Sequence, residues 1–137
     1  MGPEAQGEVS ISSDSDIVYV RKTVRTVADG LKFGITDVTR IVTAASELAR
    51  NIHLYAGSGT MRWRIIEGAK GTGLELAFID QGPGMNNVEQ ALQEGYTTGR
   101  GLGMGLPGTR RLMDEMEIIS EPGQGTTVTV KKWRRSR

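Results

Sequence analysis

Apolar residues recur three and four positions apart in two stretches of the N-terminal half of the chain. Residues 14–31 and residues 35–57 both show this spacing, which predicts two amphipathic helices that each bury one apolar stripe. Gly34 separates the two helices, and Gly57 and Gly59 end the second one. The predicted core positions are Ile17, Val20, Val24, Val27 and Leu31 in the first helix and Ile41, Ala45, Leu48 and Ile52 in the second.

The rest of the chain is dominated by short β-rich segments that are joined by glycine-bearing turns. The turns GAKGTG and PGQG each lie between two such segments, and this arrangement predicts two antiparallel hairpins. The predicted strands are 8–12, 61–68, 73–80, 117–121 and 126–133, and the further predicted helices are 86–95 and 106–116.

The order of these segments favours one fold class. Helices, a hairpin, a loop with helices and a second hairpin fit a two-layer α/β (α+β) sandwich, with helices covering one face of a mixed sheet. A doubly wound parallel sheet fits poorly, because it needs regular alternation of strands and helices, whereas tight turns join the late strands here.

Length and the character of the two chain ends suggest one domain in the cytoplasm. The 137 residues fit a single domain, with a disordered N-terminal segment at 1–7 and a basic tail at 134–137. No apolar run approaches the roughly 20 residues of a membrane span, and no basic and apolar leader starts the chain. The sequence therefore predicts a cytoplasmic protein that does not enter a membrane.

Charge and cysteine content exclude several function classes. The 17 basic residues nearly cancel the 16 acidic ones, which gives no reason to expect a nucleic-acid partner. With no cysteine and the single histidine His53, the chain cannot form disulfides, a thiolate nucleophile or a zinc site of the usual kind. Any metal ion is expected to take oxygen ligands.

The segment TTGRGLGMGLPGTRRL, residues 97–112, has glycine at every second position from 99 to 105. It fits a dinucleotide fingerprint, a lid over phosphates or a plain linker. No hydrophobic strand precedes its G-x-G-x-x-G, so the dinucleotide fingerprint is disfavoured. The Lys-Ser/Thr of a phosphate-binding P-loop is also missing. Glycine N–H groups can approach an anion, and the helix that begins at Leu106 favours negative charge at its start. From the loop alone, the lid interpretation and the linker interpretation both remain open.

The segment FIDQGPG places Asp80 at the end of an apolar strand, followed by a tight turn at Gly82 and Gly84. A partly buried carboxylate needs hydrogen-bond donors, and an amino group on a ligand would supply them. The alternative is an aspartate that starts a turn by bonding its own backbone. Both interpretations remain open for this segment alone.

The segment SELARN places Glu47 and Asn51 four residues apart, and therefore on the same face of the second helix, at the edge of its core stripe. An amide oxygen can bind Mg²⁺, and a neighbouring carboxylate can orient a nucleophile or take its proton. Two solvated side chains on a helix surface are the alternative.

Taken together and in this order, the three motifs resemble the nucleotide-binding boxes of the GHKL superfamily of ATPases and kinases. ELARN resembles the N box, DQGPG the first glycine box, GLGMG the second, and GQGT at 123–126 the last. Within that superfamily, ISELARNI, DQGPG and GLGMGLPGTRRLMDE are most similar to the stand-alone anti-sigma-factor kinases of the RsbT type, which act in the stressosome. The similarity extends from about residue 16 to residue 133.

The resemblance implies a Bergerat ATP-binding fold and a role for each motif residue. Asp80 would accept the adenine amino group, Asn51 would hold Mg²⁺, and Glu47 would act as general base. Arg50 is a candidate contact to phosphate or protein substrate. The implied nucleotide contacts are Asn51, Asp80, Gly82, Gly84, Gly99, Gly101, Leu102, Gly103, Met104, Gly105, Leu106 and Thr126.

The resemblance also implies a function with protein partners. It predicts a Mg-ATP-dependent serine/threonine protein kinase that phosphorylates STAS-domain scaffold proteins similar to RsbS and RsbR. Once released, such a kinase activates a PP2C-type phosphatase similar to RsbU. The alternatives are an anti-sigma factor or nucleotide-gated binding regulator with little kinase activity, and an ATPase without a protein substrate.

Overall fold

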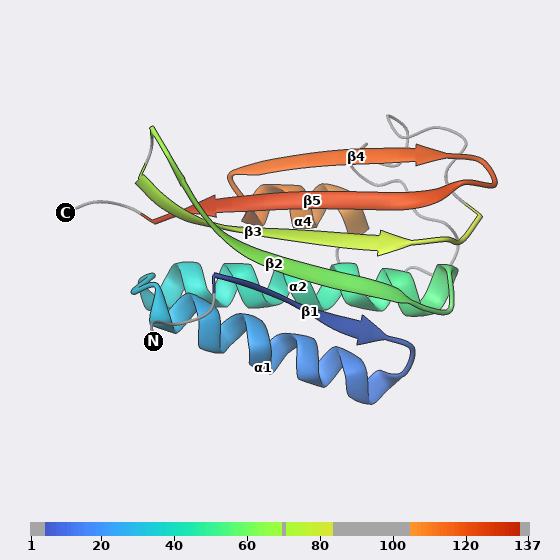
Figure 1. Cartoon of the computed structure of the whole chain (residues 1–137), viewed down its shortest axis with the longest axis horizontal. Coiled ribbons are helices and arrows are strands. Elements are labelled where there is room, and N and C mark those ends of the chain that lie inside the picture. The colour runs from blue at the N-terminus through green and yellow to red at the C-terminus, as the bar shows by residue number, and fades with distance from the viewer. Residues whose placement is uncertain (1–4, 70, 84–104, 135–137) are drawn as a thin grey trace.

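The computed structural model describes residues 5–69, 71–83 and 105–134, which form three helices and five strands. The strands make one sheet in the order β1-β2-β3-β5-β4 (Figure 1). The strands are β1 (Gln6–Ile11), β2 (Gly59–Gly68), β3 (Gly71–Asp80), β4 (Glu115–Glu121) and β5 (Gly125–Trp133), and the helices are α1 (Asp14–Gly30), α2 (Ile35–Tyr55) and α4 (Gly105–Leu112).

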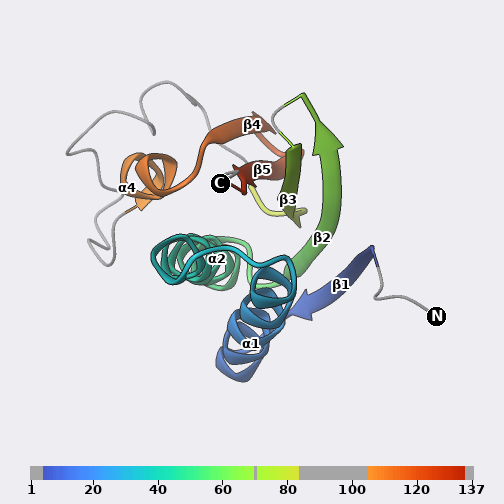
Figure 2. The same cartoon turned by 90° about the vertical axis from the view of Figure 1, so that its left-hand side faces the viewer.

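All three helices lie on one side of the sheet, with α2 between α1 and α4 (Figure 2). The predicted two-layer sandwich is therefore confirmed. The prediction of a mixed sheet is wrong, because every pair of neighbouring strands in the described ranges is antiparallel. β3 and β4 do run in the same direction, but β5 folds back on β4 as a hairpin and lies between them.

The helices form where the apolar stripes predicted them, and the stripes make the core. Ser13 caps α1 by accepting a hydrogen bond from the backbone N–H of Asp16, and a hydrogen bond from the backbone N–H of Ser12 lowers the pKa of the Asp16 carboxyl. Of the predicted core positions, only Val27 and Leu31 are partly exposed. The buried ones are Ile17, Val20, Val24, Ile41, Ala45, Leu48 and Ile52.

Two predicted boundaries differ from the structure. β1 begins at Gln6, inside the segment predicted to be disordered, because Gly7 pairs with Trp63 of β2 and leaves room for the indole ring. The last helix ends at Leu112 rather than at residue 116, because residues 115 and 116 pair with β5 instead. The helix predicted at 86–95 lies outside the described residues.

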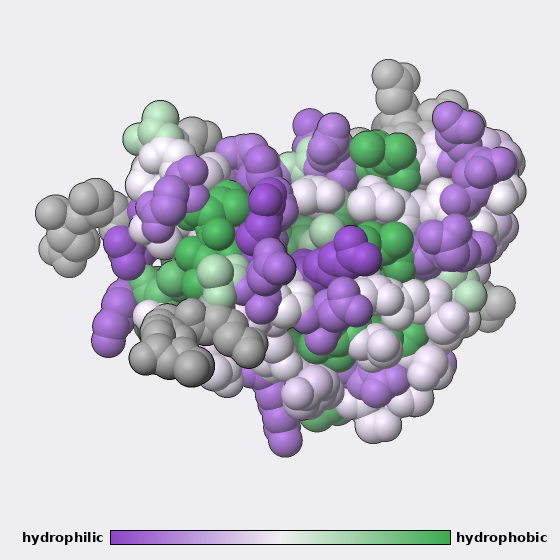
Figure 3. Space-filling model, viewed as in Figure 1, coloured by the Kyte–Doolittle hydropathy of each residue, from purple (hydrophilic) through white to green (hydrophobic). Residues whose placement is uncertain are grey.

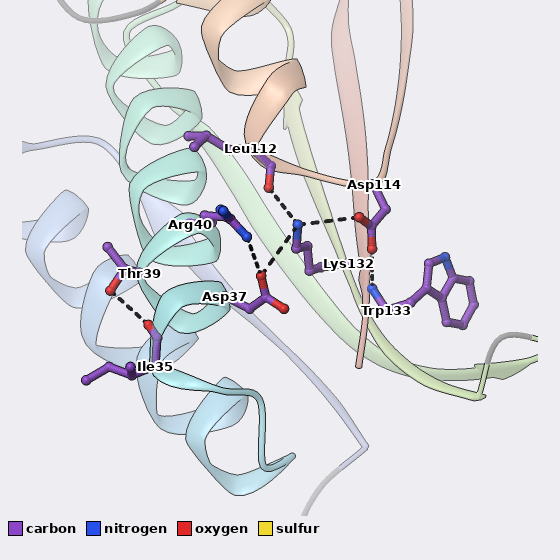
Figure 4. Close-up of polar contacts among 8 residues, drawn as sticks. All are labelled: Ile35, Asp37, Thr39, Arg40, Leu112, Asp114, Lys132 and Trp133. Atoms are coloured by element: carbon purple, nitrogen blue, oxygen red, sulfur yellow. Dashed lines mark hydrogen bonds and ion pairs between the residues drawn. The ribbon is translucent and has the colours of Figure 1, made fainter. Parts of the chain in front are cut away.

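Lys132 is 5% exposed, and its side chain joins three elements at the end of the sandwich where β5 terminates (Figure 4). Its Nζ donates to the carbonyl oxygen of Leu112, the last residue of α4, at 3.0 Å and to Oδ1 of Asp114 at 3.4 Å. Oδ1 of Asp37, near the start of α2, lies 3.8 Å away and also binds Arg40. The lysine thus satisfies a C-terminal carbonyl of α4 and ties that helix to α2.

Replacing Lys132 with methionine is expected to lower the free energy of unfolding by about 2–3 kcal/mol, because two carboxylates lose a buried partner. The loss stays below that of a fully buried pair, since water reaches both carboxylates. Urea unfolding measures it. Lys131→Met is the matched control: this lysine is 34% exposed, lies 3.9 Å from its two carboxylate partners, and should cost less than about 1 kcal/mol. Equal losses in the two variants would contradict the assigned role of Lys132.

The face of the sheet away from the helices carries charged pairs among small apolar areas (Figure 3). Arg62 binds Glu8 at 3.2 Å, and Arg64 binds Glu75 at 2.9 Å. A cavity of roughly 590 Å³ on this face is lined by residues of β1, β2 and β3 and contains none of the predicted site residues. In the described part of the chain, no helix has the length and apolarity to cross a membrane.

Candidate active site

Four residues from four neighbouring strands form a row across one end of the sheet. Gly59 of β2 is opposite Asp80 of β3, Asp80 is opposite Thr126 of β5, and Thr126 is opposite Ser120 of β4. Because side chains alternate along a strand, Asp80 and Thr126 share the helix-covered face with the buried Phe78. We call Asp80, Thr126 and Ser120 the polar row.

Glycines let the backbone approach Asp80 closely on three sides. A Cβ at Gly59 would lie 2.5 Å from the carbonyl oxygen of Ile79, and one at Gly125 would overlap the carbonyl oxygen of Asp80 itself. Gly125 also has φ +88°, a conformation that favours glycine. Gly82 was predicted from its motif. Gly59 and Gly125 were not predicted as site residues, because one marks a helix end and the other a turn in the sequence.

The Asp80 carboxylate is half-buried and is fixed by the turn that follows it. Its Oδ1 accepts a hydrogen bond from the backbone N–H of Gly82 at 2.8 Å, which is the arrangement of the turn interpretation. The turn uses Oδ1 and leaves Oδ2 outside it. A second bond, from the N–H of Gly123 to the carbonyl of Pro83 at 2.7 Å, ties this turn to the β4–β5 turn. Asp80 can therefore both start the turn and accept a hydrogen bond from a ligand.

Glu47, Arg50 and Asn51 lie on the C-terminal half of α2, and Glu47 and Asn51 are at the edge of the core, as predicted. The Glu47 side chain is 14% exposed, and its Oε2 accepts a hydrogen bond from Nη1 of Arg50 at 2.9 Å. Asn51 is half-buried one turn further on. Buried neighbours on α2, among them Leu48 and Ile52, hold this half of the helix against the sheet.

The C-terminal end of α2 lies against the turn after Asp80. A Cβ built on Gly82 would be 2.6 Å from Cβ of Ala56, the residue that follows α2. The end of α2, the polar row and the start of α4 all lie at the same end of the sandwich, at the right in Figure 1. The structure thus brings the predicted N box, the first glycine box and the last box together.

The start of α4 completes what the structure describes of the predicted site. α4 begins at Gly105 and packs against α2. Leu106 is 7% exposed and belongs to the core, and Thr109 is fully buried. The remaining predicted contacts lie outside the described residues: Gly84, Gly99, Gly101, Leu102, Gly103 and Met104.

Comparison with known proteins defines the class of protein to which this fold and site belong. Residues 36–136 match the family described as "Histidine kinase-, DNA gyrase B-, and HSP90-like ATPase". The chain belongs to this family. The predicted Bergerat-type fold, with the antiparallel sheet and helices on one face, is therefore confirmed.

Two curated relatives define the position within that family. The chain is 45% identical over 130 residues to "Serine/threonine-protein kinase RsbT" of Bacillus subtilis (strain 168), which covers 95% of this chain and 98% of the relative. An "Anti-sigma F factor" of Clostridium beijerinckii is 32% identical over 127 residues, 89% of each chain. The chain is a serine/threonine protein kinase of the RsbT type, and this assignment is favoured over the anti-sigma-factor alternative.

A solved structure supports the fold independently. A crystal structure of the RsbU and RsbW domains of Rv1364c from Mycobacterium tuberculosis matches with a TM-score of 0.68 at 20% identity. The match covers 99% of this chain and 34% of the other. At this identity the similarity concerns the fold alone.

Proposed function

We propose that the polar row binds the base of ATP and that the C-terminal half of α2 carries out phosphoryl transfer to a protein hydroxyl. The observation that carries this proposal is the position of Asp80. Its carboxylate is fixed by the Gly82 N–H, lies beside Thr126 on the helix-covered face, and is adjacent to the end of the helix that carries Glu47 and Asn51.

In this proposal Asp80 recognises the adenine base. Oδ1 is engaged by the turn, so Oδ2 accepts a hydrogen bond from the exocyclic amino group. Thr126, 9% exposed and directly across the strand pair, adds a direct or water-mediated contact to the base. Gly82 and Gly84 are the proposed shapers of the base pocket, and a Cβ on Gly82 would lie 2.6 Å from Cβ of Ala56 and 3.2 Å from Oδ1 of Asp80.

The phosphates extend from the base pocket toward the start of α4. Backbone N–H groups of the segment 99–105 and the first turn of α4 would bind them, as the N-terminus of a helix attracts an anion. Leu102 and Met104 are included among these nucleotide contacts. Because the Leu106 side chain is in the core, its contribution is expected from its backbone N–H.

Asn51 is the proposed protein ligand of Mg²⁺. Its amide oxygen suits this hard cation, and the half-buried position beside acidic Glu47 fits a site where a cation meets phosphates. When bound, Mg²⁺ would neutralise phosphate charge. The remaining task of the protein residues would be to position ATP and the substrate hydroxyl.

Glu47 is the proposed general base. Its carboxylate accepts the proton of a serine or threonine hydroxyl, the hydroxyl oxygen attacks the γ-phosphorus, and ADP leaves. Arg50 lies beside Glu47 and is 39% exposed, so its guanidinium can both orient the carboxylate and meet a phosphate or the protein substrate. Most of the rate enhancement comes from positioning and charge neutralisation.

The proposed partners come from the similarity to RsbT and from the motifs that carry it. We infer a cytoplasmic kinase, formed by residues 1–137 as one domain, whose substrates are STAS-domain proteins similar to RsbS and RsbR. Phosphorylation releases the kinase, which then activates a PP2C-type phosphatase similar to RsbU.

A competition experiment tests this partner exchange. The purified kinase is mixed with a STAS-domain protein and a PP2C-type phosphatase encoded near it, and complexes are separated by size-exclusion chromatography. Mg-ATP is expected to phosphorylate the STAS protein on serine or threonine and to shift the kinase to the phosphatase. Mg-ADP is the matched control and should cause no shift. Phosphorylation without any exchange would refute the switching role but leave the kinase intact.

A further inference from the structure

The long helix α2 keeps one face open to solvent. Exposed and partly exposed residues recur there three and four positions apart, and we call them the open stripe: Arg40, Thr43, Glu47, Arg50 and Leu54. Other faces of the helix carry its buried residues, among them Leu48 and Ile52. Because the open stripe contains the proposed general base, a protein whose hydroxyl reaches Glu47 has to lie along this stripe.

Leu54 is the apolar member of the open stripe, and 43% of this residue is exposed. It follows the buried Ile52 by two residues, which turns its side chain about 200° round the helix and away from the core. A single exposed leucine is common on protein surfaces, so exposure alone carries no argument. The position of Leu54 does, because it lies nearly two full turns after Glu47 on the same side of α2.

The spacing between Glu47 and Leu54 suits contact with one and the same protein. The rise of a helix puts their Cα atoms about 10 Å apart. Arg50 lies between them, is 39% exposed and binds Glu47 at 2.9 Å. A standard protein interface covers about 800 Å² of each partner, a patch roughly 30 Å across. An interface centred near Glu47 therefore includes Leu54.

The first helix bounds the stripe beside Leu54. Nε2 of His53 lies 3.6 Å from Oδ1 of Asp14, the first residue of α1. His53 is next to Leu54 in the sequence but points toward α1, about 100° round the helix from it. Leu54 thus stands at the open side of the α1–α2 contact, where a docked protein can reach it.

We propose that Leu54 is a specificity-determining residue for the protein substrate, which receives an apolar side chain about 10 Å from the acceptor hydroxyl. The inference rests on the proposed role of Glu47 as general base. Contact with an apolar side chain removes water from the exposed part of the leucine, whereas a polar side chain placed there would lose water without gaining a partner. Leu54 thereby selects a protein by affinity and takes no part in the transfer step.

The test measures kcat and KM for transfer from γ-labelled ATP to the STAS-domain protein of the competition experiment. In Leu54→Gln the KM for this protein is expected to rise about three- to tenfold, the effect of losing the remaining apolar burial of one leucine. The kcat and the calorimetric Kd of ATP should stay within about twofold of wild type, because binding shared by ground state and transition state affects KM alone. Leu54→Met keeps an apolar side chain of similar volume and should keep KM within about twofold of wild type.

Ile35→Gln is the matched control. Ile35 is also an aliphatic residue of α2 and is 83% exposed, but it begins the helix and lies roughly 28 Å from Leu54 along the helix axis. Its KM for the STAS-domain protein should equal that of wild type. Thermal unfolding of both glutamine variants should match wild type, since both side chains already contact water.

The outcomes separate this inference from the proposed function. An unchanged KM in Leu54→Gln, or an equal rise of KM in Ile35→Gln, would overturn the docking role of Leu54 and leave the kinase and its base standing. A fall in kcat or in ATP affinity at unchanged KM would assign Leu54 to the nucleotide site and would also overturn it. If the wild-type chain transfers no phosphate to the STAS-domain protein, the proposed substrate is wrong and the inference falls with it.

Discussion

Replacing Glu47 with glutamine is expected to slow phosphoryl transfer to a protein substrate by about 10²- to 10⁴-fold, the usual contribution of a general base. ATP affinity should stay within about twofold of wild type, because the change is isosteric and the amide oxygen still accepts the hydrogen bond from Arg50. Single-turnover transfer from γ-labelled ATP measures the rate, and calorimetry measures the affinity.

The chain offers a close control for this variant. Glu75 is also a partly buried glutamate, with 16% of its side chain exposed against 14% for Glu47, and it also binds an arginine at 2.9 Å. It lies on the opposite face of the sheet, so Glu75→Gln should transfer phosphate at the wild-type rate. Wild-type transfer by Glu47→Gln would show that Glu47 is not the base.

Replacing Asp80 with asparagine is expected to weaken ATP binding by about 10- to 150-fold, which corresponds to the ~1.5–3 kcal/mol of a hydrogen bond to a charged group. Asparagine keeps an oxygen for the N–H of Gly82, so the turn should survive. Its NH₂ group then faces the amino group of adenine, donor against donor. Calorimetric titration with ATP measures the loss.

Asp114→Asn is the control for this substitution. Asp114 also accepts a backbone N–H at 2.8 Å, from Trp133, but it lies at the opposite end of the sandwich, beside Lys132. Its ATP affinity should be that of wild type, although its stability falls. If ATP affinity in Asp80→Asn is within a factor of about two of wild type, Asp80 is a turn residue only.

Helix and strand identities could be predicted because local periodicity determines them. The stripe of α2 predicted its buried face, since four of its residues recur at helical spacing and all are buried. The direction and neighbours of the strands depend on pairing across the sheet, and that is where the prediction of a mixed sheet was wrong. The predicted C-terminal end of α4 was also wrong, because residues 115 and 116 pair with β5 and do not continue the helix.

The described site residues were predictable where a motif is contiguous in sequence. Glu47, Asp80 and Thr126 each belong to such a motif, and the structure brings their elements to one end of the sheet. Gly59 and Ser120 were missed, since their importance comes from cross-strand register with Asp80 and Thr126. The pairs 121/125 and 120/126 are centred on Gly123, and the PGQG motif alone does not determine this register.

Nucleotide is expected to bind at the end of the sandwich where α2, the polar row and α4 meet. Backbone amide NMR of the full chain, titrated with Mg²⁺ and a non-hydrolysable ATP analogue, tests it most directly. The largest shifts are expected at Gly59, Gly82, Thr126 and the C-terminal half of α2, with little change around Lys132. Shifts concentrated around Lys132, or on the charged outer face of the sheet, would contradict the account.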